Sequence, residues 1–397
     1  MYPHLSLKPD KLASSAFRHP WVFSGAIASK PDGLNHGDIV QIVDTHDKVL
    51  GTGTFSNRGS IAVRIFEFGE AIINQKWLET KIREAFIRRT QMGYGPNTET
   101  TGYRIVFGEC DSIPGLVVDR YESCIVFQLA TAGIDKLRQP IMEALVDIFH
   151  PSLLVERSDL PTRKEEGLEE FTAIHHGESQ GPIEFREQDL TFLADPVNGQ
   201  KTGFFLDQKQ LRLAIRKHAD KATVLNLFSN SGSFSVAALS GGAAEVLQVD
   251  SSQPALDATQ AQLEKNNLDI TKVTSECSDV FQWLGKNTQR TFDMVICDPP
   301  ALIKTQRDIE AGRKAYHFLN RAALRLVNHG GIFITSSCSN HLSDDDFAFT
   351  LRRAASQSGV ILHVLDSVHQ SPDHPGSIYF PEAIYLKSLV LAVSYHR

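Results

Sequence analysis

One stretch of the chain, residues 224–250, restricts the possible folds more than any other. It begins with a short apolar run, residues 224–228, of the length and composition of a buried parallel strand. A polar turn ending at Gly232 follows, and then a helical apolar pattern that two glycines end. A second apolar run ends in Asp250. This order of strand, glycine turn, helix, strand and acid predicts the nucleotide-binding half of a doubly wound α/β sheet.

The turn contains one glycine, Gly232, and lacks the G-x-G-x-x-G fingerprint whose second glycine admits a pyrophosphate. A nucleoside ligand without phosphates therefore fits better than a dinucleotide or a purely structural turn, and S-adenosylmethionine (SAM) is the common ligand of that kind. At the end of the second strand, Asp250 can accept hydrogen bonds from ribose hydroxyls.

The length and composition are typical of a soluble globular protein with two or three domains. Of the 397 residues, 42% are apolar and 22% charged. No segment approaches the ~20 apolar residues of a membrane span, and the first residues lack the apolar core of a signal peptide, so we expect a cytoplasmic protein. The five cysteines show no C-x-x-C spacing, which argues against a zinc site and a disulfide framework. We expect no bound metal. A net charge of -7 argues against non-specific coating of nucleic acid, although a local basic patch could bind RNA.

The pattern along the chain predicts four parts. Residues 1–71 contain short strands between glycine-rich and Asp-rich turns, which indicates a small β module. Residues 72–92 predict an amphipathic linking helix, whose basic face we expect to be solvated rather than bound to RNA. Residues 93–177 predict a compact α+β domain with one helix at 135–149, which could serve as an RNA platform. Residues 178–397 predict a β-hairpin followed by the doubly wound domain.

Three cations are the predicted RNA contacts. Arg18 lies beside Trp21 and Phe23, a combination that could bind RNA by stacking and phosphate pairing. We expect instead that Trp21 and Phe23 are core residues of the β module and that Arg18 is exposed. Arg157 in the middle domain and Lys201 in the loop that follows the hairpin are the other two, and for Arg157 an ordinary polar loop is the alternative.

A glycine-bracketed loop with two aromatic residues, at 199–208, precedes the nucleoside site and leads into a predicted helix, Lys209–His218. Its position is typical of a cofactor lid. Ordinary packing between domains accounts for the same pattern equally well.

Later strand ends carry further candidates. Asp279 follows a third strand, where its carboxylate could accept from the adenine amine. The strand Phe292–Cys297 ends at Asp298, and the two prolines after it make a stiff loop that holds this acid at the carboxyl edge of the sheet. Cys338 follows the next strand on a polar loop, where a reactive thiol is expected. By contrast, Cys297 lies inside its apolar strand, as a buried core residue would.

These groups fit methyl transfer to carbon 5 of cytosine. That carbon is a poor nucleophile until a thiolate adds to carbon 6 and pushes electron density toward it. In this scheme Cys338 is the nucleophile and Asp298 hydrogen-bonds the pyrimidine edge; the base that removes the carbon 5 proton is not identified by the sequence. An enzyme acting on an exocyclic amine needs an aromatic residue directly after the prolines, where Ala301 and Leu302 lie.

Longer motifs occur in one order along nearly the whole chain, at residues 19–25, 114–121, 156–159, 201–208, 298–300, 337–339 and 385–387. In these motifs the chain resembles the ribosomal RNA large-subunit methyltransferase I family. Its members are cytosine-5 enzymes with a PUA β-barrel, a middle α+β domain and a class I methyltransferase domain. The resemblance implies this α/β fold class, large-subunit ribosomal RNA as partner, a PUA domain that helps to hold RNA, and a chain that could pair as a homodimer.

The resemblance also implies that residues 228–232, Asp250 and Asp279 bind SAM and that Cys338 is the nucleophile. Adding the loops and strand ends around them, we expect cofactor contacts from Phe204, Asp207, Gln208, Asn226, Phe228, Ser229, Asn230, Gly232, Asp250, Ser251, Asp279, Val280, Asp298 and Pro299.

Two other functions remain open at this point. One is a SAM-dependent methyltransferase of another RNA base or position, which would tolerate the loss of Cys338. The other is a non-catalytic RNA-binding factor with a methyltransferase fold, and the retention of Asp250 and Asp279 beside Gly232 argues against it.

Overall fold

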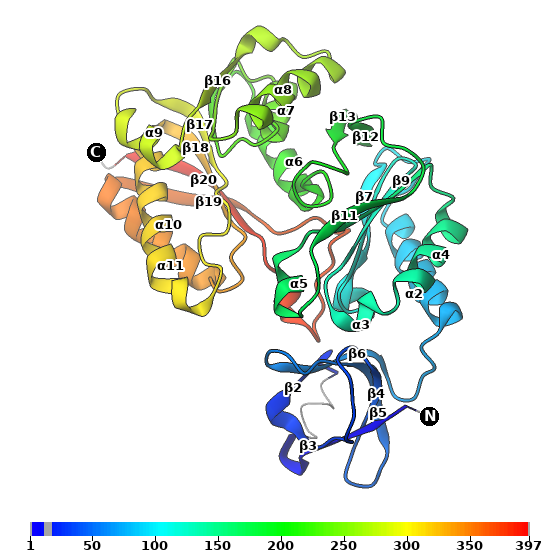
Figure 1. The fold of residues 1–397 in the computed structure, drawn as a ribbon. Helices are drawn as coiled ribbons and strands as arrows, with labels where there is room; N and C mark the ends of the chain where they lie inside the picture. The colour runs from blue at the N-terminus through cyan, green and yellow to red at the C-terminus, as the bar shows by residue number, and fades with distance from the viewer. Residues whose placement is uncertain (1, 12–17, 396–397) are drawn as a thin grey trace. The chain divides into compact units, whose positions relative to one another are not determined.

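The structure is a computed structural model that describes residues 2–11 and 18–395 (Figure 1). These residues form two compact units. Unit 1 comprises the described parts of residues 1–189, 193–206 and 372–383, and unit 2 comprises 190–192, 207–371 and the described part of 384–397. Within the described residues, no helix combines the length and the apolar character needed to cross a membrane.

The N-terminal part of unit 1 is a six-stranded sheet in the order β2-β6-β5-β4-β1-β3. Its core is aliphatic, with Leu5, Val40, Ile42 and Val63 fully buried. Gly53 lies at a bulge between β5 and β6, where an added Cβ would come within 2.2 Å of the Arg64 carbonyl oxygen. The strands are β1 (His4–Leu7), β2 (Trp21–Phe23), β3 (Ile27–Ser29), β4 (Ile39–Val43), β5 (Val49–Phe55) and β6 (Ile61–Phe68).

The expectation that Trp21 and Phe23 are core residues of this sheet is wrong. Phe23 is 47% exposed, and Trp21 is only partly buried, with its indole Nε1 donating to Glu109 at 2.8 Å. Side chains alternate along a strand, so burial of Val22 between them turns both aromatic rings to the opposite face.

The middle part of unit 1 is a five-stranded sheet in the order β11-β10-β9-β8-β7, with helices α2 and α4 packed in its core. The predicted helix at 135–149 is present but begins later, as α4 at Arg138, after the short helix α3 that ends at Asp135. A continuous helix would carry Pro140 in its interior, whereas Pro140 is tolerated in the first turn of α4. The elements are α2 (Gln75–Gln91), β7 (Gly102–Phe107), β8 (Leu116–Tyr121), β9 (Cys124–Leu129), α3 (Ala132–Asp135), α4 (Arg138–Phe149), β10 (Leu153–Ser158), α5 (Pro161–Glu165) and β11 (Phe171–His176). A two-stranded sheet of β12 (Ile183–Glu187) and β13 (Leu190–Ala194) follows.

Unit 2 contains the predicted doubly wound sheet, with seven strands in the order β16-β15-β14-β17-β18-β20-β19. All are parallel except β20, which runs antiparallel to both neighbours. The strand order reverses between β14 and β17, and ligands of such sheets bind at the carboxyl ends of the strands beside that switch point. The strands are β14 (Thr223–Leu227), β15 (Glu245–Asp250), β16 (Val273–Cys277), β17 (Phe292–Cys297), β18 (Val327–Ser337), β19 (Val360–Val368) and β20 (Lys387–Tyr395).

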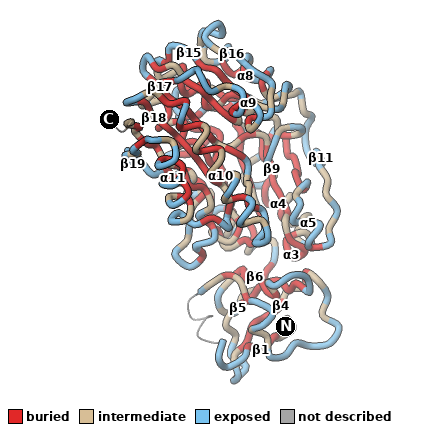
Figure 2. The backbone as a smooth tube through the Cα atoms, turned by 90° about the vertical axis from the view of Figure 1, so that its left-hand side faces the viewer, coloured by how far each residue is buried: buried red, intermediate tan, exposed pale blue. Residues whose placement is uncertain are grey.

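Helices cover both faces of this sheet. Figure 1 shows α10 and α11 side by side over one face, and Figure 2 shows β17 and β18 as buried strands next to helices whose outer positions are exposed. The apolar core runs from Leu225 and Val249 through Val295 and Phe333 to the inner sides of α10 and α11. The helices are α6 (Lys209–His218), α7 (Ser233–Ser240), α8 (Gln253–Lys265), α9 (Val280–Lys286), α10 (Ile309–Leu324) and α11 (Asp344–Ser358).

Candidate active site

The candidate active site lies at the carboxyl edge of the sheet in unit 2. Phe228, Asp298 and Cys338 directly follow the parallel strands β14, β17 and β18, and Asp250 is the last residue of β15. Because parallel strands end at the same edge, the register of the sheet brings these four residues to one side of the domain.

The turn after β14 has an unusual backbone. Phe228, Asn230 and Gly232 all have positive φ, at 60°, 48° and 75°. An added Cβ at Gly232 would lie 2.4 Å from Thr259 of α8, so this position needs glycine both for its backbone angle and for the approach of α8. A positive φ is rare for an aromatic residue such as Phe228 and is a form of strain often found at functional sites.

The Asp250 carboxylate fixes this turn against β15. Its Oδ2 accepts from the backbone N–H of Asn230 and its Oδ1 from that of Ser252, both at 2.9 Å. Each carboxylate oxygen keeps a further lone pair, and the residue is only partly buried. Asp250 is therefore held in place and can still accept hydrogen bonds from a ligand.

Ser251, directly after β15, and Asp279, shortly after the neighbouring strand β16, are both exposed. Asp279 caps α9, accepting from the Gln282 N–H at 2.9 Å, while the next residue, Val280, is 2% exposed. The carbonyl of Ser251 accepts from the Cys277 thiol at 3.6 Å.

Asn226 lies inside the sheet rather than at its edge. It is 0% exposed, and its Nδ2 donates to Ser235 of α7 at 3.0 Å. The chain of hydrogen bonds continues from Ser235 to Gln248, and from Gln248 to Thr259 and Ser275. These bonds tie Asn226 to α7 and β15, and its predicted contact with a cofactor stays a prediction.

On the other side of the switch point, Asp298 accepts a hydrogen bond from Gln208 Nε2 at 3.1 Å. The preceding residue, Asp207, accepts from the Tyr385 hydroxyl at 2.6 Å and through its carbonyl from the Ser371 N–H at 2.9 Å. Pro299 is buried after Asp298. These bonds tie the start of α6, the loop after β17 and the segment before β20 together.

Two buried polar atoms at this edge, Gln208 Oε1 and Ser229 Oγ, have no hydrogen-bond partner among the described residues. Burying such a group without a partner costs about 1–3 kcal/mol. Together with Asp250, they form a set of polar groups that suits a ligand with many donors and acceptors, and SAM, with its ribose, adenine, ammonium and carboxylate groups, is such a ligand.

The loop after β18 surrounds Cys338 with ordered hydroxyls. Cys338 is partly buried, between the fully buried Ser337 and Ser339. Ser337 Oγ donates to the Tyr316 hydroxyl at 2.9 Å, and Tyr316 is 3.0 Å from Ser339 Oγ. Ser339 Oγ in turn accepts from the Ile303 N–H at 3.2 Å, which ties this loop to the one that carries Asp298.

The interpretation of Cys297 as a core residue is confirmed, because it is 0% exposed and burial raises the pKa of its thiol far above the ordinary value.

Lys387, at the start of β20, is a residue to which sequence reasoning gave no role. It is 5% exposed, donates to the Tyr385 carbonyl at 2.9 Å, and stands opposite Ser337 in the sheet register. The motif at 385–387 was its only signal in the sequence, since its place beside Cys338 depends on cross-strand register.

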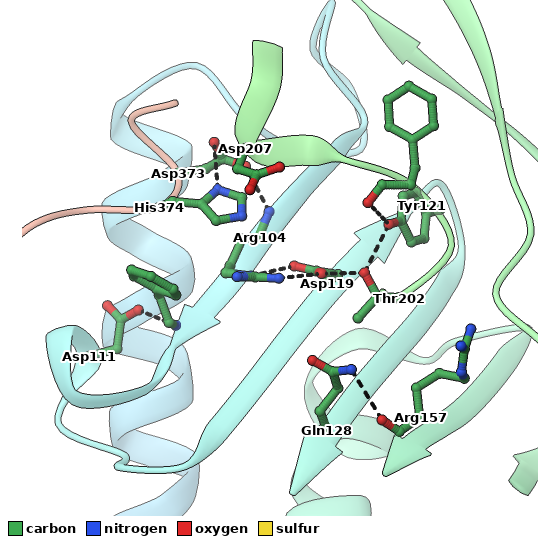
Figure 3. A network of polar contacts seen from close by, with 12 residues as sticks. Arg104, Asp111, Asp119, Tyr121, Gln128, Arg157, Thr202, Asp207, Asp373 and His374 are labelled. Atoms are coloured by element: carbon green, nitrogen blue, oxygen red, sulfur yellow. Dashed lines mark hydrogen bonds and ion pairs between the residues drawn. The ribbon is translucent and has the colours of Figure 1, made fainter. Parts of the chain in front are cut away.

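In unit 1, the loop of residues 195–205 is anchored rather than free. Thr202 Oγ1 donates to Asp119 at 2.6 Å and lies 3.1 Å from the Tyr121 hydroxyl, and Asp119 also accepts two hydrogen bonds from Arg104 (Figure 3). Phe204 is buried in the same unit, edge-to-face with Phe185. Of the two interpretations of this loop, a lid or structural packing, the contacts in unit 1 favour packing.

The predicted RNA contacts differ in exposure. Arg157 is only 5% exposed; it pairs with Asp159 and donates to the carbonyls of Pro196 and Gly199, which leaves its guanidinium little access to a phosphate. Arg18 and Lys201 are both exposed, with the Lys201 ammonium 4.2 Å from the centre of the Phe205 ring. Among the described residues, no group of three or more His, Cys, Asp or Glu side chains could hold a metal ion.

The fold and this edge of the sheet define a SAM-dependent methyltransferase. A family model described as S-adenosylmethionine-dependent methyltransferase matches residues 170–391, and one described as PUA-like domain matches residues 5–68. The predicted fold class and the predicted cofactor are thereby confirmed.

Relatives identify the family within that class. Ribosomal RNA large subunit methyltransferase I of Klebsiella pneumoniae (strain 342) is 33% identical over 397 residues, which cover 99% of each chain. The protein of the same name from Escherichia coli O157:H7 is 34% identical over 399 residues, covering 99% of this chain and 100% of that one. The chain belongs to the ribosomal RNA large subunit methyltransferase I family.

Solved structures agree with this fold. SMU.776, a methyltransferase complexed with SAH, has a TM-score of 0.85 and 22% identity, with 98% of this chain and 99% of that chain covered. A second structure, described as a SAM-dependent methyltransferase from Streptococcus mutans, has a TM-score of 0.83 at the same identity and coverage.

Proposed function

We propose that this protein methylates carbon 5 of a cytosine in large-subunit ribosomal RNA through a covalent adduct with Cys338. The observation that carries the proposal is that Cys338 and Asp298 directly follow the adjacent parallel strands β18 and β17, with their loops joined by the Ser339–Ile303 hydrogen bond. The relatives named for large-subunit ribosomal RNA support the substrate.

The chemistry requires a nucleophile that can reach carbon 6 of the pyrimidine and a carboxyl group that can hydrogen-bond the edge of the same ring. The Cys338 thiolate adds to carbon 6, which forms the Sγ–C6 bond and moves an electron pair to carbon 5. Asp298 hydrogen-bonds the pyrimidine edge and stabilises the adduct. Bound SAM would supply the methyl group as an electrophile for carbon 5, with the methyl–sulfonium bond breaking as the new bond forms and S-adenosylhomocysteine as the leaving group. A base then takes the carbon 5 proton, and the returning electron pair breaks the Sγ–C6 bond and releases the thiolate.

The residues proposed to hold SAM surround the switch point. Asp250 would accept from the ribose hydroxyls and Asp279 from the adenine amine. The turn at 228–232 and the buried oxygens of Gln208 and Ser229 would contact the rest of the molecule.

RNA would contact exposed cations of unit 1. Arg18 and Lys201 keep this proposed role because both are exposed. Arg157 instead has a structural role, holding the loop at 195–205. The cytoplasmic location and the homodimer remain predictions.

The test is nucleoside mass spectrometry of unmodified large-subunit ribosomal RNA after incubation with SAM and protein. The wild type should form 5-methylcytosine and Cys338→Ala should form none. The matched control is Cys110→Ala, because Cys110 is also partly buried but lies in unit 1, where burial raises the pKa of its thiol to about 12. This control should retain activity.

A second measurement isolates the adduct. RNA with 5-fluorocytosine at the target blocks the loss of the carbon 5 substituent, so a covalent protein–RNA complex should accumulate with the wild type and not with Cys338→Ala. Methylation of another base, or activity that survives Cys338→Ala, would overturn the mechanism and favour a different RNA position as target. If no SAM binds at all, the chain is a non-catalytic RNA-binding factor.

A further inference from the structure

A buried lysine stands next to the proposed nucleophile. Lys387 begins β20 at the point where β18 ends, and it lies directly opposite Ser337, the residue before Cys338. Residues opposite each other in an antiparallel pair have Cβ atoms about 5 Å apart and project to the same face. The sheet register therefore fixes Lys387 beside the start of the loop that carries Cys338.

The ammonium group of Lys387 has few partners for a buried cation. Its Nζ donates one hydrogen bond, to the Tyr385 carbonyl at 2.9 Å, and in the described structure no carboxylate forms an ion pair with it. A buried charge without a counter-ion is unfavourable, so the site suits an anion. The Asp344 carboxylate acts on this cation without forming an ion pair with it, and the nearby group that becomes an anion in the proposed reaction is the Cys338 thiol.

The electrostatics of the neighbourhood agree with this geometry. Burial is the largest influence on Lys387 and lowers its pKa, whereas the negative forms of Asp344 and Cys338 both act to raise it. The interaction is reciprocal, because a cation that is stabilised by a thiolate stabilises that thiolate equally.

Three titratable groups from different elements face this loop. Lys387 comes from β20, Asp344 from the first turn of α11, and Tyr316 from α10. Burial raises the pKa of Tyr316, so its hydroxyl stays protonated at neutral pH and hydrogen-bonds to the serines on both sides of Cys338. The Asp344 carboxylate acts on Lys387, and Lys387 supplies the positive charge.

We propose that Lys387 is a positioning residue that holds Cys338 as a thiolate, the form that attacks carbon 6. This inference rests on the proposed function, in which Cys338 is the nucleophile. A lysine acting in this way needs no contact with RNA or SAM. The thiol proton leaves to solvent, and the charge that remains on sulfur is balanced by the ammonium.

The Tyr385 link gives Lys387 a defined position. The backbone carbonyl of Tyr385 accepts from Lys387, and the side-chain hydroxyl of Tyr385 donates to Asp207. Gln208, the residue after Asp207, donates to Asp298. One short run of residues thus orders the cation beside Cys338 and the amide beside Asp298.

The test follows the alkylation of Cys338 by iodoacetamide as a function of pH, in the full-length protein without RNA or SAM. Mass spectrometry of the Cys338 peptide distinguishes this thiol from the other four. Loss of a nearby cation should move the midpoint of the profile upward by about one pH unit and lower the rate near neutral pH about tenfold.

Three substitutions separate charge from structure. Lys387→Gln keeps a donor for the Tyr385 carbonyl without the charge and should show the full shift, as should Lys387→Met. Lys387→Arg keeps the charge and should restore the wild-type midpoint. Lys286→Met removes an exposed lysine at the end of α9 and should leave the profile unchanged. Circular dichroism checks that each variant is folded, and if Lys387→Met does not fold, Lys387→Gln carries the test.

The inference would be overturned if folded Lys387→Gln had the same midpoint of Cys338 alkylation as the wild type. It would also be overturned if Lys387→Arg shifted that midpoint as far as Lys387→Gln does. Because alkylation needs no methyl transfer, its result is independent of the proposed function. A shifted profile combined with methylation that survives Cys338→Ala would retain the electrostatic role of Lys387 and refute the covalent mechanism.

Discussion

Two regions of the molecule bury polar side chains and satisfy them differently. In the middle sheet of unit 1, Asp119 is 0% exposed and both its oxygens accept from Arg104, while one also accepts from Thr202. At the edge of the sheet in unit 2, Gln208 and Ser229 each bury an oxygen that has no partner in the described structure.

The difference separates a structural network from a binding site. Paired charges lose stability when one partner is removed, because the other is left buried without compensation. An unpaired polar atom at a strand edge gains a partner only when a ligand arrives, so its removal should affect binding more than folding. The predictions below test this contrast in order of expected effect.

Asp119→Ala should have the largest effect. It leaves the Arg104 guanidinium, 9% exposed, without its carboxylate, and breaking such a buried pair typically costs about 3–5 kcal/mol of unfolding free energy. Urea unfolding followed by circular dichroism measures the loss. The control is Glu245→Ala, which breaks the exposed pair with Arg290 and should cost less than about 1 kcal/mol. Equal losses in the two variants would refute the distinction.

Asp250→Asn should weaken SAM binding with a smaller effect on folding. Loss of the charged acceptor should lower the affinity about 10–100-fold, which corresponds to about 1.4–2.8 kcal/mol, as measured by calorimetric titration. Asp293→Asn is the matched control. Asp293 also accepts from a backbone N–H, that of Thr223 at 2.9 Å, but it lies near the amino end of β17. Its substitution should lower stability and leave SAM affinity unchanged; unchanged affinity in Asp250→Asn would contradict the proposed site.

Gly232→Ala tests the turn itself. The new Cβ would lie 2.4 Å from Thr259 with φ at 75°, and the combined strain and overpacking should cost about 1–3 kcal/mol. Gly330→Ala is the control, since Gly330 has a φ of 80° but no atom within 4 Å of the new Cβ. It should report the backbone cost alone. Thermal unfolding of the two variants gives the difference, and identical melting temperatures would show that the contact with α8 is not tight.

The sequence predicted the edge of unit 2 well because its determinants are local. Each of the strands before Asp250, Asp298 and Cys338 is a short apolar run, and parallel strands of a doubly wound sheet end together. The hydrogen bonds of Asn226 could not be predicted in this way, because its partner Ser235 lies on α7 and Ser235 in turn donates to Gln248 on the neighbouring strand. Nothing in the local pattern of β14 distinguishes a polar residue that faces a helix from one that faces a ligand.

Long-range contacts account for the other differences. Residues 360–368 form β19, of which most positions are exposed, so its apolar periodicity is weak, and β20 inserts between β18 and β19. The local sequence pattern does not predict that β20 pairs with β18, and without that pairing nothing places Lys387 near Cys338. In unit 1, Arg157 resembles a surface cation in the sequence, yet the two carbonyls that it binds lie about forty residues further along the chain, at Pro196 and Gly199.

Lys201→Gln should have the smallest effect and tests the comparison at the RNA surface. Lys201 is exposed, so its loss should leave stability within about 0.5 kcal/mol of wild type. If it contacts a phosphate, RNA binding should weaken modestly and the slope of log affinity against log salt should fall by about one. Filter binding at several salt concentrations measures this slope.

Arg157→Gln provides the opposite case. The buried guanidinium of Arg157 donates to backbone carbonyls, so its loss should lower stability and leave the salt slope unchanged. An unchanged slope for Lys201→Gln would remove Lys201 from the RNA path, and a reduced slope for a folded Arg157→Gln would return Arg157 to it.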